Sequence, residues 1–164
     1  MELQVLRKRV RIVLGFFVVA LVLSGVTAFP LQWETGILVQ LFGPGTFVGN
    51  LWPALAHWIS YIHQGIADTA QTYPFIAYGT DWLAFAHIVI GVAFVGPLRD
   101  PVKNLWVIEF GMIACALVIP LAMICGPIRG IPFVWRLVDC SFGVVGIIPL
   151  WITRTMIRRM ARLG

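Results

Sequence analysis

Long apolar runs, separated by shorter polar segments, dominate the pattern of this chain. The runs cover residues 10–29, 79–97, 101–125 and 138–157. Each is close to the roughly 20 residues that a helix needs to cross a hydrocarbon core of about 30 Å. The second run is short and the fourth slightly long, differences that helix tilt absorbs. The pattern therefore predicts an all-α fold with four membrane-spanning helices.

The connection between the second and third runs carries helix boundary signals. Gly96 and Pro97 predict the end of the second helix. Asp100 is a capping residue, and Pro101 follows it at a position where the missing N–H costs nothing. We therefore expect the third helix to begin at Pro101. No internal repeat is present, so residues 1–164 are predicted to form a single membrane domain.

The segment between the first two runs, residues 30–78, has a different pattern. It contains an apolar patch at 36–42, a Gly-Pro-Gly turn at 43–45 and then a stretch with helical periodicity. That stretch has an apolar stripe of Trp52, Leu55, Ile59, Ile62 and Ile66 opposite a polar face of His57, Ser60, Gln64 and Asp68. We expect an amphipathic helix that lies on the membrane surface or on the bundle. With the loop at 126–137, this segment is expected to cover the mouth of the bundle.

Composition and charge placement define the class of protein and its orientation. The chain is 60% hydrophobic and 12% charged, with a mean hydropathy of +0.92. Soluble domains are about a quarter charged, so lipid is the expected solvent. Ten of the twelve Lys and Arg residues flank the spans on one side, namely Arg7, Lys8, Arg9, Arg11, Arg99, Lys103, Arg154, Arg158, Arg159 and Arg162. The positive-inside rule then predicts that both termini are cytoplasmic and that the segments at 30–78 and 126–137 are extracytoplasmic.

The same features indicate a small protein of a bacterial-type inner membrane. The basic N-terminal residues, the apolar run and the small residues before Phe29 also resemble a signal peptide, but the run is longer than a usual signal core. We expect it to remain as the first helix. The basic clusters flank spans and form no separate basic domain, so nucleic acid is not an expected partner. The expected partners are membrane lipid, further copies of the chain, or a larger membrane complex.

Ionisable residues inside a bilayer are costly and suggest functional sites, with structural ion pairs as the alternative. His87 lies about 15 Å and Glu109 about 12 Å from the inner ends of their helices, given a rise of 1.5 Å per residue. The two side chains are therefore expected at similar depth, where a hydrogen-bonded pair would suit a proton-carrying group. Alternatively, Glu109 pairs with Arg154 and only joins two helices.

A second polar group is expected at the extracytoplasmic ends of the spans. Asp81 and Asp139 begin the second and fourth helices, where acidic side chains favour helix N-termini. Arg129 and Arg136 lie on the same side and need partners. An ion-pair network with these aspartates is one interpretation. Binding of an anionic headgroup, a carboxylate or a haem propionate is the other.

Metal, haem and disulfide chemistry receive weaker support. Only His87 lies on a span, so a bis-histidine haem would need His63, or less suitably His57, as its second ligand. No spacing predicts a dedicated metal site. Cys125 and Cys140 flank the short loop at 126–137, and a disulfide between them is one option on the extracytoplasmic side.

Three hypotheses for function follow, and the class of activity stays open among them. The first is binding of a lipid-soluble or amphipathic ligand (a lipid, a quinone or haem), or a role as an accessory membrane subunit. The second is a proton-coupled transporter or channel that uses His87 and Glu109. The third is a membrane-embedded enzyme that uses Asp81, His87 and Asp139.

Overall fold

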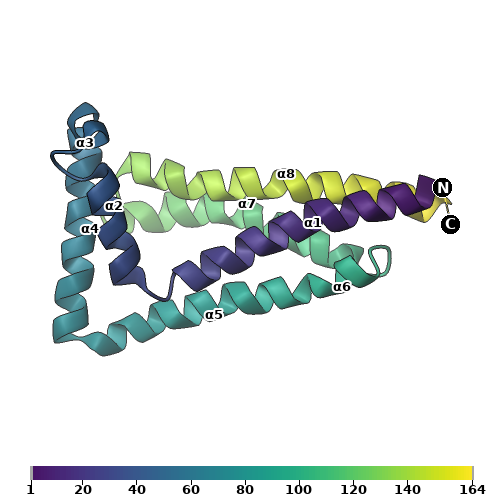
Figure 1. Cartoon of the computed structure of the whole chain (residues 1–164), viewed down its shortest axis with the longest axis horizontal. Coiled ribbons are helices and arrows are strands. Elements are labelled where there is room, and N and C mark those ends of the chain that lie inside the picture. The colour runs from purple at the N-terminus through teal and green to yellow at the C-terminus, as the bar shows by residue number, and fades with distance from the viewer. Residues whose placement is uncertain (1, 164) are drawn as a thin grey trace. The chain divides into compact units, whose positions relative to one another are not determined.

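The computed structural model describes residues 2–163 and is all-helical, with 88% of the chain in helices. In chain order the elements are α1 (Glu2–Thr27), α2 (Leu31–Phe42), α3 (Phe47–Leu51), α4 (Pro53–Thr72), the 3-10 helix η1 (Pro74–Ile76), α5 (Ala77–Ala93), α6 (Val95–Arg99), α7 (Leu105–Ile128) and α8 (Phe133–Leu163). Figure 1 shows them in one colour sequence from the N- to the C-terminus.

Four helical segments are long and apolar enough to cross a membrane. They are Glu2–Thr27, Pro74–Arg99, Leu105–Ile128 and Phe133–Leu163, and the second of them joins η1, α5 and α6. Each corresponds to one of the predicted apolar runs, so the prediction of an all-α fold with four helices long and apolar enough to cross a membrane is confirmed. Within the described residues the helices extend past the apolar runs at both ends of the chain, because the flanking basic residues are themselves helical.

By its internal contacts the described chain divides into two compact units. Unit 1 contains residues 2–20 and 91–163, and unit 2 contains Leu21–Ile90. The helices α1 and α5 each contribute to both units. A single membrane domain over the whole chain stays a prediction.

In unit 1 the helices α7 and α8 lie side by side (Figure 1). Gly143 on α8 is buried against the carbonyl oxygen of Cys115 on α7, where an added Cβ would collide. Gly146 packs against the same cysteine, with its Cβ position 3.0 Å from Sγ. Small residues let helix backbones approach closely in lipid, where no hydrophobic effect drives helices together.

Large apolar side chains fill the rest of the unit 1 core. Phe94 is 1% exposed, and its ring lies 5.1 Å from the ring of Phe17. Gly111 on α7 has no side chain, and this leaves room for the ring of Phe94. Other fully buried side chains of this unit are Val10, Leu14, Ile108, Leu150 and Ile157.

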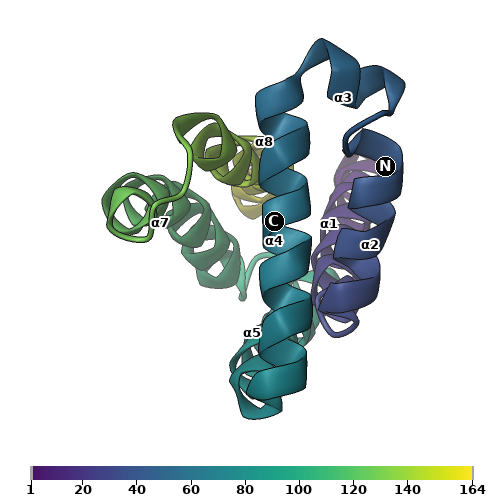
Figure 2. The ribbon, with the colours of Figure 1, turned by 90° about the vertical axis from the view of Figure 1, so that its left-hand side faces the viewer.

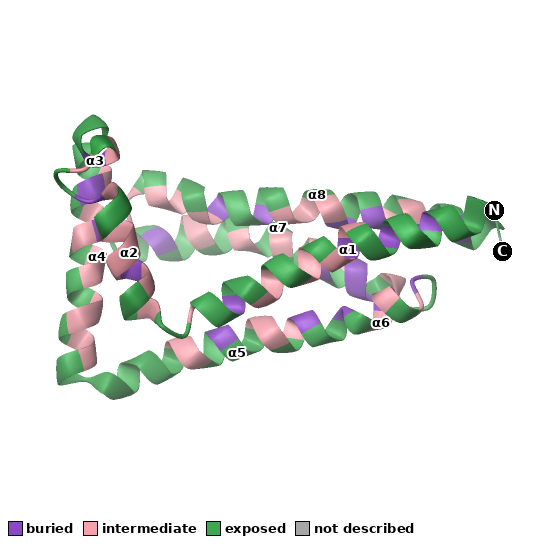
Figure 3. Cartoon of the chain, viewed as in Figure 1, coloured by how far each residue is buried: buried purple, intermediate pink, exposed green. Residues whose placement is uncertain are grey.

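The outward faces of α7 and α8 are apolar and exposed (green in Figure 3). Phe142 is 70% exposed and Val145 is 65% exposed. Exposed apolar surface on this scale is costly in water and costs nothing in hydrocarbon. These faces therefore fit a lipid environment.

The third helix begins four residues later than the predicted start near Pro101. Residues 101–104 form turns, and α7 begins at Leu105. The carboxylate of Asp100 does cap a backbone N–H, that of Lys103 at 3.3 Å, but within a turn. Asn104 then ties this turn to the preceding helix, because its amide donates to the carbonyls of Asp100 (2.9 Å) and Gly96 (3.3 Å). An Asp-Pro pair suits the start of a turn as well as the start of a helix.

In unit 2 the helices α2 and α4 lie side by side, with α3 beyond one end of the pair (Figure 2). The expected turn at 43–45 separates α2 from α3, and Gly45 adopts the positive φ of 86° that glycine favours. The apolar patch at 36–42 had no predicted structure of its own. It forms the second half of α2.

The helix α4 confirms the amphipathic pattern in part. Ile59 is 4% exposed, and His57, Gln64 and Asp68 on the opposite face are exposed, as expected. Trp52, by contrast, is 47% exposed, although it was assigned to the apolar stripe. The reason is that Trp52 precedes α4 as its N-cap residue, so it does not follow the helical wheel.

Candidate functional site

The Glu109 carboxylate binds two arginines of the neighbouring helix. Its Oε1 accepts a hydrogen bond from Arg154 Nε at 2.9 Å and another from an Arg158 amino group at 3.2 Å. Arg154 also lies over the Trp151 ring, 6.0 Å from its centroid. Charge-assisted hydrogen bonds of this kind are stronger than neutral ones. They join α7 to α8, which is the structural alternative expected for Glu109.

Two further arginines of unit 1 bind a backbone carbonyl and a carboxylate near the ends of helices. Arg11 donates to the carbonyl of Leu98 at 3.1 Å, which lies in the last turn of α6. Cations near a helix C-terminus are stabilised by the helix dipole. Arg159 near the end of α8 pairs with Glu2 at the start of α1. Both ends of the described chain therefore lie close together within unit 1.

The predicted network of Arg129, Arg136 and Asp139 is not formed within unit 1. None of the ion pairs among residues 2–163 involves these three side chains. Arg136 lies against Gly126, where an added Cβ would collide with its side chain, and its guanidinium lies 5.1 Å from the Phe133 ring. Packing of this long side chain between the ends of α7 and α8 takes the place of ion pairing.

Asp81 lies in unit 2 beside a small apolar groove of about 300 Å³. The groove is otherwise lined by aromatic side chains, which are Phe29, Tyr78, Trp82 and Phe85. No cation lines it. Within unit 2 this aspartate therefore has an aromatic environment, and its pairing with an extracytoplasmic arginine stays a prediction.

His87 is engaged within its own helix. Its Nδ1 lies 2.9 Å from the carbonyl oxygen of Leu83, one turn earlier. Its Cβ lies 2.8 Å from the position that a Cβ on Gly25 would take. These contacts hold His87 at a close approach of α1 and α5, and its pairing with Glu109 stays a prediction.

The proposed disulfide is not present, because Cys125 and Cys140 are both free thiols. Cys125 is exposed on α7, whereas Cys140 is buried on α8, so the two side chains face different surroundings. Among residues 2–163, no group of three or more His, Cys, Asp or Glu side chains could hold a metal ion. His57 lies on the exposed face of α4.

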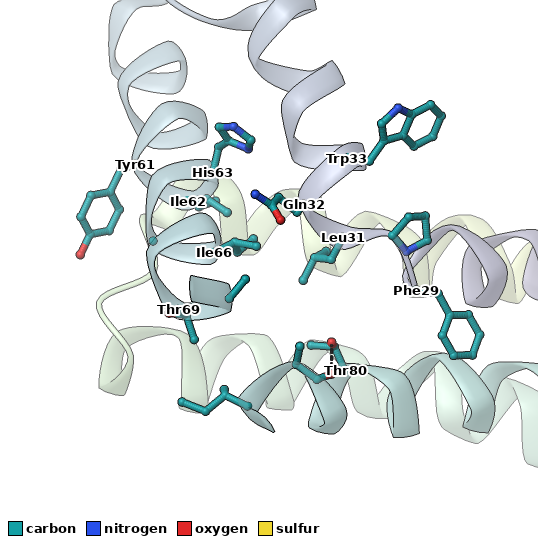
Figure 4. A pocket seen from close by; sticks show the side chains of 15 residues that line it. Phe29, Leu31, Gln32, Trp33, Tyr61, Ile62, His63, Ile66, Thr69 and Thr80 are labelled. Carbon is teal, nitrogen blue, oxygen red and sulfur yellow. Dashed lines mark hydrogen bonds between the residues drawn. The ribbon is translucent and has the colours of Figure 1, made fainter. Parts of the chain in front are cut away.

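A cavity of about 960 Å³ lies within unit 2. Its walls come from the turn between α1 and α2, from α2 and α4, and from η1 and the start of α5 (Figure 4). The lining residues are Phe29, Pro30, Leu31, Gln32, Trp33, Tyr61, Ile62, His63, Gly65, Ile66, Thr69, Ala70, Ile76, Ala77 and Thr80. We call this space the unit 2 cavity. It has an apolar wall with a few polar groups and no charged side chain.

Two polar side chains meet where α2 faces α4. In Figure 4 the side chains of His63 and Gln32 point into the space between the two helices, above Leu31 and Ile66. Trp33 and Tyr61 point away from this space, and Thr69 and Thr80 lie at the opposite end of the lining. The cavity therefore has one end with a histidine and an amide, and a mostly apolar remainder that carries two hydroxyl groups.

Thr35 fixes the His63 ring. Thr35 is 6% exposed, and its hydroxyl oxygen lies 3.0 Å from His63 Nδ1. The same hydroxyl lies 2.9 Å from the carbonyl oxygen of Leu31 and 3.1 Å from that of Gln32. Gly36 is next to the ring, since a Cβ there would lie in ordinary van der Waals contact with His63 Cε1, at 3.5 Å. The ring is therefore held between two adjacent positions of α2.

Among the lining residues of this cavity, the sequence indicated His63 as the only candidate site residue, and it placed Ile62 and Ile66 on the apolar stripe of a helix. The other walls depend on α2, for which an apolar patch of seven residues gave no helical prediction. A usable signal does exist in α2, where the small residues Thr35 and Gly36 follow one another between larger side chains. Small residues at adjacent positions mark the face of a helix that another helix approaches.

Comparisons with known proteins assign no function to this cavity. No family model matches the sequence, and neither the search of curated proteins nor that of solved structures finds a match. A proposal for function must therefore rest on the chemistry of the residues that line the unit 2 cavity.

Proposed function

We propose that this protein is a membrane protein that binds a lipid-soluble ligand in the unit 2 cavity, alone or as an accessory subunit of a larger complex. The observation that carries this proposal is the cavity itself. Its volume of about 960 Å³ falls at the upper end of the range typical of small-molecule sites. Such sites combine mostly apolar walls with a few polar groups that orient the ligand, as this cavity does.

The position of the cavity along the chain supports access from the bilayer. The helices α2 and α4 belong to the segment between the first two spans, and the cavity also includes the start of the second span. We propose that α4 lies in the membrane interface, where Trp and Tyr side chains are favoured. A ligand dissolved in the bilayer would then reach the cavity without crossing water.

Among the ligands considered from sequence, a neutral lipid or a quinone fits the lining better than haem. The lining contains a single histidine and no guanidinium. Haem would need an axial ligand in the cavity and cations for its propionates. The arginines that were expected to hold an acidic group, Arg129 and Arg136, belong to unit 1.

The transporter and enzyme hypotheses gain no specific support. Glu109 is engaged by two arginines, so protonating it would weaken two charge-assisted hydrogen bonds. Asp81 and Asp139 belong to different units. The binding proposal is therefore the one that a geometric observation favours.

The test is to fill the cavity and to measure what remains bound. Ala70→Trp places an indole in the cavity, and Ala54→Trp places the same side chain on an exposed position of α4 outside it. The purified wild type, in mild detergent, should carry a lipid-soluble molecule that native mass spectrometry detects. We expect Ala54→Trp to retain this molecule and Ala70→Trp to lose it, with equal helicity by circular dichroism. Equal occupancy in the two variants would refute binding in this cavity.

A further inference from the structure

We infer that the ligand of the unit 2 cavity is uncharged and bears a hydroxyl group that donates its hydrogen to His63 Nε2. This inference rests on the proposed function and specifies the chemical class of the ligand. Three features of the cavity carry it, namely the absence of charge in the lining, the hydrogen bonds of Thr35, and the free polar groups of His63 and Gln32.

The absence of charge bears on the head group of the ligand. None of the lining residues is Lys, Arg, Asp or Glu. Burying an ionised group without a partner is far more costly than burying a neutral polar group with a hydrogen bond. A carboxylate, a phosphate or an ammonium group would therefore bind poorly. The cavity favours a neutral polar head.

The hydrogen bonds of Thr35 determine which nitrogen of His63 carries the proton. A threonine hydroxyl has one hydrogen to donate and two lone pairs that accept. The carbonyls of Leu31 and Gln32 only accept, so the hydrogen of Thr35 is directed to them. The hydroxyl oxygen then accepts from His63, and Nδ1 must carry the hydrogen in this contact of 3.0 Å. Neutral His63 therefore presents a lone pair on Nε2.

This lone pair is available to a ligand. Among residues 2–163, no side chain or backbone group forms a hydrogen bond with His63 Nε2. The ring is half-buried and lines the cavity. Nε2 is also accessible, since it is not among the buried unpaired atoms, so a bound hydroxyl group can reach it and supply the hydrogen bond that it lacks.

Gln32 supplies a second polar contact. Its side chain points into the same space between α2 and α4 (Figure 4). The amide both donates and accepts, so it can bind a second hydroxyl, a carbonyl or an ether oxygen of the head. The apolar tail would then lie along Leu31, Ile62, Ile66, Ala70 and Ile76. An alkylated hydroquinone and a diacylglycerol both have this chemistry.

The test compares each hydroxyl ligand with its methyl ether on the purified full-length protein. The probes are a decyl-substituted hydroquinone and its dimethyl ether, dioctanoylglycerol and its methyl ether, and decanoate as the anion. One hydrogen bond corresponds to about a tenfold preference for the alcohol over the ether. We expect this preference for at least one of the two ligand classes. The class that shows it identifies the source of the ligand.

Substitutions in the His63 contact separate this inference from the proposed function. His63→Phe keeps an aromatic ring in place and should reduce the alcohol-to-ether preference to about one. Thr35→Val removes the acceptor for Nδ1–H and should reduce the same preference, whereas Ala54→Trp should leave it unchanged. If Ala70→Trp abolishes binding of alcohol and ether alike but the wild type shows no preference between them, the binding function stands and this inference fails. If Ala70→Trp has no effect on binding, the proposed function fails as well.

A readout that needs no ligand tests the tautomer directly. The ¹⁵N chemical shifts of the His63 ring, assigned by difference with His63→Phe, distinguish a protonated Nδ1 from a protonated Nε2. We expect a protonated Nδ1 in the wild type and a mixture of tautomers in Thr35→Val. A hydrogen on Nε2 in the wild type, or tighter binding of decanoate than of the alcohols, would overturn the inference.

Discussion

The Glu109 carboxylate shows how a single charged residue is accommodated in an apolar helix pair. Glu109 is 38% exposed and Arg154 22% exposed as side chains, so neither is fully solvated. Arg158, one turn after Arg154, shares the same carboxylate oxygen. Three charges in contact reduce the cost of placing each of them near lipid.

The first prediction concerns this contact. Glu109→Gln should lower the free energy of unfolding by about 1–3 kcal/mol, because it leaves a part-buried guanidinium without its charged acceptor. The measurement is reversible unfolding in mixed detergent micelles, followed by tryptophan fluorescence. Lys103→Gln is the matched control, since Lys103 is 84% exposed in its pair with Asp100. Exposed pairs of this kind contribute little, so the control should stay near the wild type. Equal effects in the two variants would show that the Glu109 contact has no special role.

At the scale of residues, the sequence predicted the ion-pair partner of Glu109 but not the polar contact that lines the unit 2 cavity. Counting residues from the inner ends placed His87 and Glu109 at similar depth, with Arg154 as the alternative partner of Glu109, and the structure pairs Glu109 with Arg154. The contact of Thr35 with His63 could not be found in this way. This contact depends on which faces of α2 and α4 meet. Counting residues from the end of a span gives no information on these two helices, because they lie outside the spans.

At the scale of helices, the contact of α7 with α8 depends on residues that have no side chain. Gly143 meets the backbone of α7 at Cys115, and Gly111 leaves space for a buried ring. Helix association in lipid relies on this kind of close packing. The approach of the two backbones is therefore sensitive to a single methyl group.

The second prediction tests this close approach. Gly143→Ala should destabilise the protein by about 1–3 kcal/mol, because overpacking forces backbone shifts. Gly15 on α1 is the matched control, since a Cβ there would meet nothing within 4 Å. Gly15→Ala should be neutral or stabilise by up to about 1 kcal/mol through the higher helix propensity of alanine. The same unfolding assay measures both variants, and a stable Gly143→Ala protein would contradict the close contact.

Elements with a strong periodic or length signal were predicted, and the others were not. The four spans follow from run length alone, because a helix must satisfy its own backbone hydrogen bonds in lipid. The helix α2 was missed because a short apolar patch fits a helix or a strand equally well. The start of α7 was placed four residues early, since Asp100 and Pro101 fit a turn as readily as a helix N-terminus. The cavity depends on α2, so it could not be predicted from the apolar runs.

At the scale of the whole molecule, the number of spans and the placement of basic residues together predict the orientation in the membrane. Four crossings return the chain to the side on which it began, whichever side that is. Within unit 1 the pairing of Glu2 with Arg159 agrees with this count, because it joins the start of α1 to the last turns of α8. Which side is cytoplasmic then depends on the basic residues that flank the spans.

The third prediction is the orientation. Ten of twelve Lys and Arg residues lie on the side of the termini, so we expect both termini in the cytoplasm and α4 on the opposite face. In a variant with Cys115, Cys125 and Cys140 replaced by Ala, single cysteines are introduced by Gln71→Cys and Ala161→Cys, both at exposed positions. A membrane-impermeant maleimide should label Gln71→Cys in intact spheroplasts and Ala161→Cys only after permeabilisation. The reverse pattern would place the unit 2 cavity on the cytoplasmic side, and labelling of both positions in intact cells would contradict the three crossings expected between them.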